Sequence, residues 1–323
     1  MNCLKECRYL CTTGVEWRRL CIKDGVICHC VKIISLGEIL WDLLPDAEHL
    51  GGAPFNFAFH AHTLDHQVCF VSAIGDDPRG DRALQRVVEV NLSSRYIRRI
   101  PYHPTGTVTV TLDATAAPQY QIHRPAAYDF PALDSDQLHD LLTPGPDWIY
   151  FGTLQQMSPQ AHHLFQELLA QSPNSKRFYD VNLRLHSYTP ELVRTLANHA
   201  DVLKLNEYEL PVLAEVANIT GSSLEEFCRN CARIFHLEAV CVTLGQKGCV
   251  LLRREQYVEA PGFHVKVADT IGAGDAFSAA LVHGFGSGWS TMQIAEFANR
   301  VGALISSRPG GTPKWTIEEA IAL

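Results

Sequence analysis

The sequence predicts an α/β protein in which helices cover both faces of a mostly parallel sheet and a small β-lid lies beside it. From Val31 onward, short apolar runs typical of buried strands alternate with amphipathic helical stretches. Strands separated by helices in this way are typical of parallel sheets. Residues 107–123 break the alternation with a period of two, which is typical of a hairpin with one polar face.

The elements follow in chain order. Strands of the main sheet are expected at 32–36, 68–74, 148–151, 177–181, 202–205 and 239–243. Helices are expected between them, among others at 82–90, 159–170, 190–197 and 224–235. A strand at 264–267 is expected before the apolar helix that begins near Ala276. The lid is expected from about 39–50 and 105–125, with a strand at 39–44 and a hairpin of 107–112 and 120–123 around a turn at 113–118.

Composition limits the class of protein. The chain has 323 residues, 46% hydrophobic and 19% charged, with a net charge of −8. This favours a globular domain over disorder and argues against a nucleic-acid partner. No apolar run approaches the roughly 18–20 residues that cross a bilayer, so no membrane association is expected.

The cysteines divide the chain into an extension and a main domain. Six of the 11 cysteines fall in residues 1–30, where frequent charges argue against a secretory signal. We expect residues 1–30 to form a poorly ordered, cysteine-rich extension and residues 31–323 to form the functional domain. The other cysteines suit reduced, buried thiols, and the expected location is the cytoplasm.

The segment from Asp269 to Phe277 carries the strongest chemical signal. Gly272 and Gly274 allow a tight turn at the start of a helix, where free N–H groups and the helix dipole attract an anion such as a phosphate. Asp275 lies in the first turn of that helix. It suits either a base that accepts a proton from an attacking hydroxyl or an ordinary helix cap.

Two common phosphate motifs are absent. Gly75 and Gly80 have P-loop spacing, but the Lys and Ser/Thr of a P-loop do not follow. Phe277 stands where a dinucleotide fingerprint has its third glycine.

Several motifs, in order along the chain, are similar to those of the ribokinase-like (PfkB) family of carbohydrate kinases. They are Gly37-Glu38-Ile39-Leu40-Trp41-Asp42, Gly51-Gly52-Ala53-Pro54-Phe55-Asn56, Asn206-Glu207-Tyr208-Glu209, Thr243-Leu244-Gly245-Gln246-Lys247-Gly248 and Asp269–Asp275. The resemblance runs from about Val31 to Leu323. It implies a ribokinase-like three-layer fold and transfer of a phosphoryl group from ATP to a sugar hydroxyl, with Mg²⁺ as cofactor.

The resemblance also implies residue roles. Asp275 is implied as the catalytic base, beside an anion hole formed by Gly272, Ala273 and Gly274. Sugar contacts are implied for Asp42, Gly51, Gly52, Asn56, Arg124, Asn182 and Arg184. Nucleotide contacts are implied for Asn206, Thr243, Gly245, Gly248 and Asn299. Glu209 is implied to organise Mg²⁺ through water, and Asp269, Ile271 and Gly310 to lie near a K⁺ site.

The acceptor sugar stays open at this point. Asp180-x-Asn182-x-Arg184 resembles a motif of fructokinases and 2-keto-3-deoxygluconate kinases, whereas His123 and His186 depart from their patterns. Fructose or a related ketose is the expected acceptor. The alternatives are 2-keto-3-deoxygluconate, a nucleoside, or a homologue that binds sugar or nucleotide without catalysis. The resemblance also implies a homodimer formed through the lid.

Overall fold

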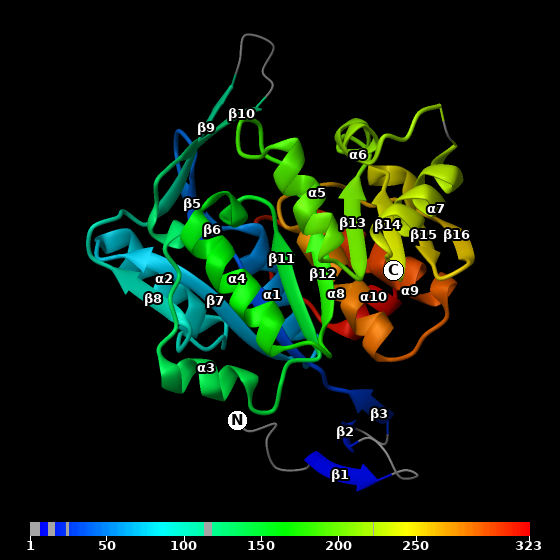
Figure 1. Cartoon of the computed structure of the whole chain (residues 1–323), viewed down its shortest axis with the longest axis horizontal. Coiled ribbons are helices and arrows are strands. Elements are labelled where there is room, and N and C mark those ends of the chain that lie inside the picture. Colours follow the sequence, from blue (N-terminus) through cyan, green and yellow to red (C-terminus); the bar gives the residue numbers. More distant parts are fainter. Residues whose placement is uncertain (1–6, 12–16, 24–25, 113–117, 222) are drawn as a thin grey trace.

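The computed structural model spans residues 1–323, and the structure describes all of them except 1–6, 12–16, 24–25, 113–117 and 222 (Figure 1). Its main feature is a nine-stranded sheet in the order β16-β15-β14-β13-β12-β11-β4-β7-β8. The strands from β14 to β8 in this order are parallel, whereas β15 and β16 are antiparallel to their neighbours. The bounds are β4 (Lys32–Leu36), β7 (Gln67–Gly75), β8 (Ile97–Ile100), β11 (Trp148–Gly152), β12 (Lys176–Asp180), β13 (Val202–Asn206), β14 (Ala239–Thr243), β15 (Gly248–Arg253) and β16 (Gln256–Pro261).

Helices cover both faces of this sheet, so the expected three-layer α/β fold is confirmed. One face packs against α1 (Ala53–Thr63), α2 (Pro78–Glu89), α8 (Ala273–Gly286), α9 (Thr291–Ser306) and α10 (Ile317–Ile321). The other packs against α3 (Ser135–Leu142), α4 (Pro159–Gln171), α5 (Pro190–Asn198), α6 (Leu210–Ala217) and α7 (Leu224–Phe235). Successive strand residues point to opposite faces, as Ile33 and Ile34 do, which is why the strands are apolar throughout.

A four-stranded sheet at the edge of the body corresponds to the expected lid. It consists of β5 (Leu40–Leu43), β6 (Glu48–Gly51), β9 (Gly106–Leu112) and β10 (Pro118–His123), in the order β10-β9-β5-β6. Most of the turn expected at 113–118 lies outside the described residues. Contacts with α2 hold this sheet in place. The Trp41 ring lies 4.5 Å from the Arg82 guanidinium carbon, its Nε1 donates to the Arg79 carbonyl, and Glu48 pairs with both arginines.

The prediction of a strand at 264–267 is wrong. These residues belong to an irregular segment between β16 and α8. The last residue of β16 is Pro261, which has no N–H group with which to continue the ladder. Val265 and Val267 line a cavity instead of packing into a sheet.

Three strands precede the main domain. β1 (Cys7–Cys11), β2 (Trp17–Lys23) and β3 (Val26–His29) form a separate antiparallel sheet. Because part of this region lies outside the described residues, the expected poor order of residues 1–30 stays a prediction. Among the described helices, none combines the length and the apolar character needed to span a lipid bilayer.

Candidate active site

The candidate residues gather where the parallel strands end. Glu38 follows β4, Asp180 ends β12, Asn206 ends β13 and Thr243 ends β14. The carboxyl ends of parallel strands meet at one edge of a sheet, and ligands of open α/β folds bind outside that edge. The sheet order therefore places the residues expected for sugar and for nucleotide along a single edge.

The glycine turn before α8 has the geometry of an anion hole. Gly272 caps the helix with a φ of 75°, a left-handed conformation that favours glycine. A Cβ added there would lie 2.4 Å from the carbonyl oxygen of Gly311, so the two backbones touch. The first N–H groups of a helix have no partner within it. That of Ala273 donates to the carbonyl oxygen of Thr270 at 3.3 Å, whereas that of Gly274 would be available to a phosphate oxygen.

A buried hydrogen-bonded chain supports Gly311. Trp315 Nε1 donates to Nδ1 of His60 at 3.0 Å, so His60 carries its proton on Nε2 and donates it to the Gly311 carbonyl, also at 3.0 Å. His60 lies on α1 and is fully buried, and burial lowers its pKa to about 4. The ring is therefore neutral at pH 7, and it links α1 to the segment behind the glycine turn.

Asp275 lies beside that turn in surroundings that would suit a base. It lies in the first turn of α8, is 8% exposed, and accepts a hydrogen bond from Nδ2 of Asn56 at 2.9 Å. Desolvation and the nearby Asp180 carboxylate raise its pKa from 3.8 to about 6. Asn56 lies on α1, so two distant parts of the chain fix the orientation of the carboxylate. An ionised, oriented carboxylate next to a phosphate site can accept a proton from a hydroxyl.

A cavity of about 370 Å³ adjoins the other side of the glycine turn. Asp275 does not line it; its carboxylate contacts Asn56, one of the residues expected to bind the acceptor. The residues expected to contact nucleotide line it, Asn206 excepted; Thr243, Gly245, Gly248 and Asn299 do so together with Ala273 and Gly274.

Local contacts fix the shape of this cavity. Gly245 and Gly248 close the turn between β14 and β15, with φ angles of 57° and 100°. Asn299 donates from Nδ2 to the carbonyl groups of Ala260 and Pro261, at 3.0 and 3.1 Å. The two glycines thus close a hairpin turn and also line the cavity, and their contact with a nucleotide stays a prediction.

Glu209 and Asn206 form a compact unit at the end of β13. Glu209 is 5% exposed, and its carboxylate accepts the N–H groups of Leu183 at 2.7 Å and Asn206 at 2.9 Å. Desolvation raises its pKa above the ordinary value. These two backbone hydrogen bonds fix the orientation of the carboxylate, and each oxygen keeps a lone pair with which it could accept a metal-bound water. The described residues contain no group of three or more His, Cys, Asp or Glu side chains that could hold a metal directly.

On the acceptor side, Asp42 of β5 packs against the glycine pair. A Cβ on Gly51 would lie 3.0 Å from Oδ2 of Asp42. Gly52 has a φ of 108° and is the N-cap of α1, which carries Asn56. Burial raises the pKa of Asp42 from 3.8 to about 6, partly offset by Arg184. Asp42, the glycine pair and Asn56 therefore belong to neighbouring elements.

The two arginines expected to contact sugar differ in their surroundings. The Arg124 guanidinium pairs with Asp129, which is 3% exposed, and also donates to the Leu154 carbonyl at 2.9 Å. Its charge is therefore already neutralised. Arg184 is exposed and donates to Oδ1 of Asn182 at 2.6 Å. It remains the arginine with capacity for a ligand.

The residues expected near K⁺ also lie together. The Asp269 carboxylate accepts the N–H of Ile271 and the N–H of Gly310, each at 3.0 Å. This ties the glycine turn to the segment containing Gly311. Activation by K⁺ stays a prediction, as does a homodimer formed through the lid.

Sequence reasoning missed several buried charges. Glu38 is 6% exposed, and its Oε2 has no hydrogen-bond partner among the described residues. Burial raises its pKa to about 7, and Arg184, Asp275 and Arg124 lie close enough to influence it. In the sequence, Glu38 could be recognised as a charged residue that stands between two apolar runs. Asp180 and Lys204 form a buried ion pair that the spacing of residues does not reveal.

Comparisons with known proteins agree with this geometry. A model of the pfkB family of carbohydrate kinases matches residues 46–317. The sugar kinase PH1459 of Pyrococcus horikoshii is 29% identical to this chain, in an alignment that covers 87% of this chain and 93% of the length of PH1459. Its structure in complex with ATP has a TM-score of 0.76 and covers 90% of this chain and 97% of that one, at 26% identity.

Two fructokinases are also similar. Fructokinase-2 of Solanum lycopersicum is 26% identical over 90% of this chain and 95% of its own length. The fructokinase of Vibrio cholerae, solved with fructose, ADP and calcium, is 25% identical with a TM-score of 0.73, covering 87% of this chain and 94% of that one.

Fold and site define an enzyme of the phosphotransferase class with a ribokinase-like architecture. The chain belongs to the pfkB family of carbohydrate kinases, and its activity is that of a sugar kinase.

Proposed function

We propose that this enzyme transfers the γ-phosphoryl group of ATP to a hydroxyl of fructose or a related ketose. The observation that carries the proposal is the position of Asp275. It lies at the start of α8, next to a cavity lined by its neighbours Ala273 and Gly274, and it is held by Asn56 of the helix that follows the glycine pair. A kinase needs a base between its two substrates, and the position of this carboxylate supports that role.

In this mechanism Asp275 accepts the proton of the attacking hydroxyl. The N–H groups at the start of α8 then neutralise charge on the transferred phosphoryl oxygens, which is where most stabilisation arises in such reactions. Mg²⁺, when bound by the phosphates, adds positive charge there, and Glu209 would hold one of its waters. The small sheet carrying Asp42 excludes water from the acceptor.

Charge favours an uncharged ketose over a sugar acid. The acceptor side holds the carboxyl groups of Asp42, Glu38 and Asp275, whereas Arg124 is neutralised by Asp129. An anionic acceptor such as 2-keto-3-deoxygluconate would face net repulsion from these groups. Arg184 is the feature that favours the sugar acid, and it keeps that acceptor as the second candidate.

ATP consumption measured with a panel of acceptors tests the proposal. The panel contains fructose, 2-keto-3-deoxygluconate, ribose and adenosine, with the Asp275→Ala variant as the control for background hydrolysis. We expect the highest kcat/KM with fructose. Highest turnover of the sugar acid would establish the second candidate, highest turnover of adenosine would point to a nucleoside kinase, and binding without turnover would contradict catalysis altogether.

A further inference from the structure

A buried ion pair lies directly behind the glycine turn. Nζ of Lys204 is 3.1 and 3.2 Å from the two carboxylate oxygens of Asp180, and both residues are almost fully buried. They are register partners on the neighbouring parallel strands β12 and β13. None of the roles assigned above uses this pair.

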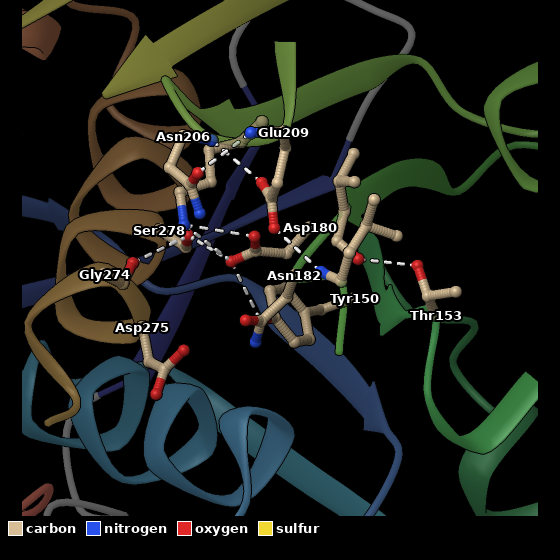
Figure 2. A network of polar contacts seen from close by, with 12 residues as sticks. Tyr150, Thr153, Asp180, Asn182, Asn206, Glu209, Gly274, Asp275 and Ser278 are labelled. Carbon is tan, nitrogen blue, oxygen red and sulfur yellow. Dashed lines mark hydrogen bonds and ion pairs between the residues drawn. The ribbon is translucent and has the colours of Figure 1, made fainter. Parts of the chain in front are cut away.

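Asp180 connects the pair to the helix that carries the base (Figure 2). Oγ of Ser278, one turn along α8, lies 2.8 Å from Oδ2 of Asp180 and 3.0 Å from the carbonyl oxygen of Gly274. A hydroxyl has one proton, and the carboxylate is the stronger acceptor for it. Tyr150 donates to the same carboxylate at 3.1 Å, and its ring stacks on Phe57 of α1. Asp180 therefore links the strand ends with both helices of the site.

The ammonium group of Lys204 lies close to a helix N-terminus, a position that favours an anion over a cation. A Cβ added to Gly274 would lie 3.3 Å from Nζ of Lys204, so the cation sits against the first turn of α8. A helix N-terminus carries partial positive charge and favours anions, not cations. A buried ion pair gives little net stability in return for its desolvation. The carboxylates that surround Lys204 offset these costs, and negative charge in the glycine turn would offset them further.

The ammonium group stays charged in this setting. Burial lowers the pKa of Lys204, but the carboxylates of Asp180, Glu209 and Asp275 outweigh that effect, so its pKa lies above the ordinary value. These acidic groups approach from β12, from the end of β13 and from α8, the elements that face Lys204. A permanent positive charge is thus held within the wall of the phosphate site.

We propose that Lys204, held by Asp180, is a positioning residue whose charge acts through the glycine turn to favour the phosphoryl group as it moves from ATP to the acceptor. The inference rests on the proposed kinase function and adds a residue to it. Gly274 then has a second role, since the absence of a side chain leaves space for the ammonium group. Ser278 fixes the distance between Asp180 and the turn.

Three lysine variants test this proposal. Lys204→Met removes the charge and keeps the length of the side chain, whereas Lys204→Arg keeps the charge. Lys32→Met is the matched control, because Lys32 is 5% exposed and lies at the amino end of β4, away from the site. We expect Lys204→Met to lower kcat about 10²-fold, the loss typical of one oxyanion-stabilising group. Lys204→Arg should retain more activity than Lys204→Met, and Lys32→Met should keep kcat within about threefold of the wild type.

Binding measurements separate this role from a purely structural one. In calorimetry, Lys204→Met should raise the Kd of a non-hydrolysable ATP analogue about tenfold, because the charge acts on the terminal phosphate. The Kd of ADP should stay within about threefold of the wild-type value. The single variant leaves the buried Asp180 carboxylate unpaired and could misfold for that reason. The double variant Asp180→Asn/Lys204→Met removes both charges and serves as the control for this effect. It should recover thermal stability but not activity.

Two results would overturn the proposal. One is a kcat within about threefold of the wild type in Lys204→Met or in the double variant. The other is an equal loss of affinity for ADP and for the ATP analogue. The binding experiment needs no acceptor, so it still tests Lys204 if fructose proves to be the wrong sugar. Failure of the proposed function would appear separately, as a wild-type enzyme without ketose turnover.

Discussion

Replacing Asp275 with asparagine should inactivate the enzyme and at the same time stabilise it. The asparagine side chain would keep the hydrogen bond from Asn56 but could not accept a proton. Removal of a general base typically lowers turnover by about 10²–10⁴-fold. The buried carboxylate of the wild type is unfavourable for folding at neutral pH, because desolvation raises its pKa from 3.8 to about 6.

The size of the stabilisation follows from that pKa. A rise from 3.8 to about 6 corresponds to about 3 kcal/mol between the ionised and the protonated forms. Since the pKa is raised in the folded state, the folded protein binds the proton more tightly than the unfolded chain does. The unfavourable contribution is therefore absent below about pH 4, grows between about pH 4 and 6, and is complete above about pH 6.

The assay is equilibrium unfolding in urea at pH 7 and at pH 4, combined with turnover. At pH 7 the free energy of unfolding of Asp275→Asn should exceed that of the wild type by up to about 3 kcal/mol, and at pH 4 the two should converge. In the wild type, kcat/KM should rise as the pH increases through about 6, because the ionised carboxylate is the active form. The same rise should persist in Asp42→Asn. A variant that is less stable at pH 7, or one that keeps a tenth of the wild-type turnover, would refute the reasoning.

Two further predictions concern neighbouring contacts. Gly272→Ala should lower turnover at least about tenfold, because its Cβ would push against the carbonyl oxygen of Gly311. Gly288 has a similar φ of 71° but open space around it. Gly288→Ala should therefore leave turnover unchanged in the same assay. Arg124→Met should reduce the free energy of unfolding by about 3–5 kcal/mol, because it leaves the buried Asp129 carboxylate unpaired. Adding Asp129→Asn should restore part of that loss in urea unfolding, and no restoration would count against the ion pair as the cause.

The sequence predicts the layered fold well, because its signals are local. Residues 32–36 and 239–243 are apolar runs of strand length, and they form strands with those bounds. The strand at 264–267 is predicted wrongly because alternating apolar residues line a cavity as readily as they fill a sheet. Local pattern cannot separate the two environments.

The site is predictable only in part. The glycine turn and Asp275 stand out because special backbone geometry and a carboxylate occur together within a few residues. Lys204 cannot be recognised in the sequence, because its partner Asp180 is 24 residues away and only strand pairing brings the two together. The neutralisation of Arg124 by Asp129 is likewise invisible until the chain has folded. Each missed feature depends on a contact between elements.

The support of Gly311 by His60 and Trp315 affects when the protein can begin to work. Residues 31–253 supply every strand of the main sheet except β16, yet the backbone behind the glycine turn comes from residues near 311 and is secured through Trp315. During synthesis on the ribosome, most of the sheet can therefore assemble before the glycine turn makes contact with the backbone at Gly311. We expect a growing chain to complete this turn only once Trp315 has been added.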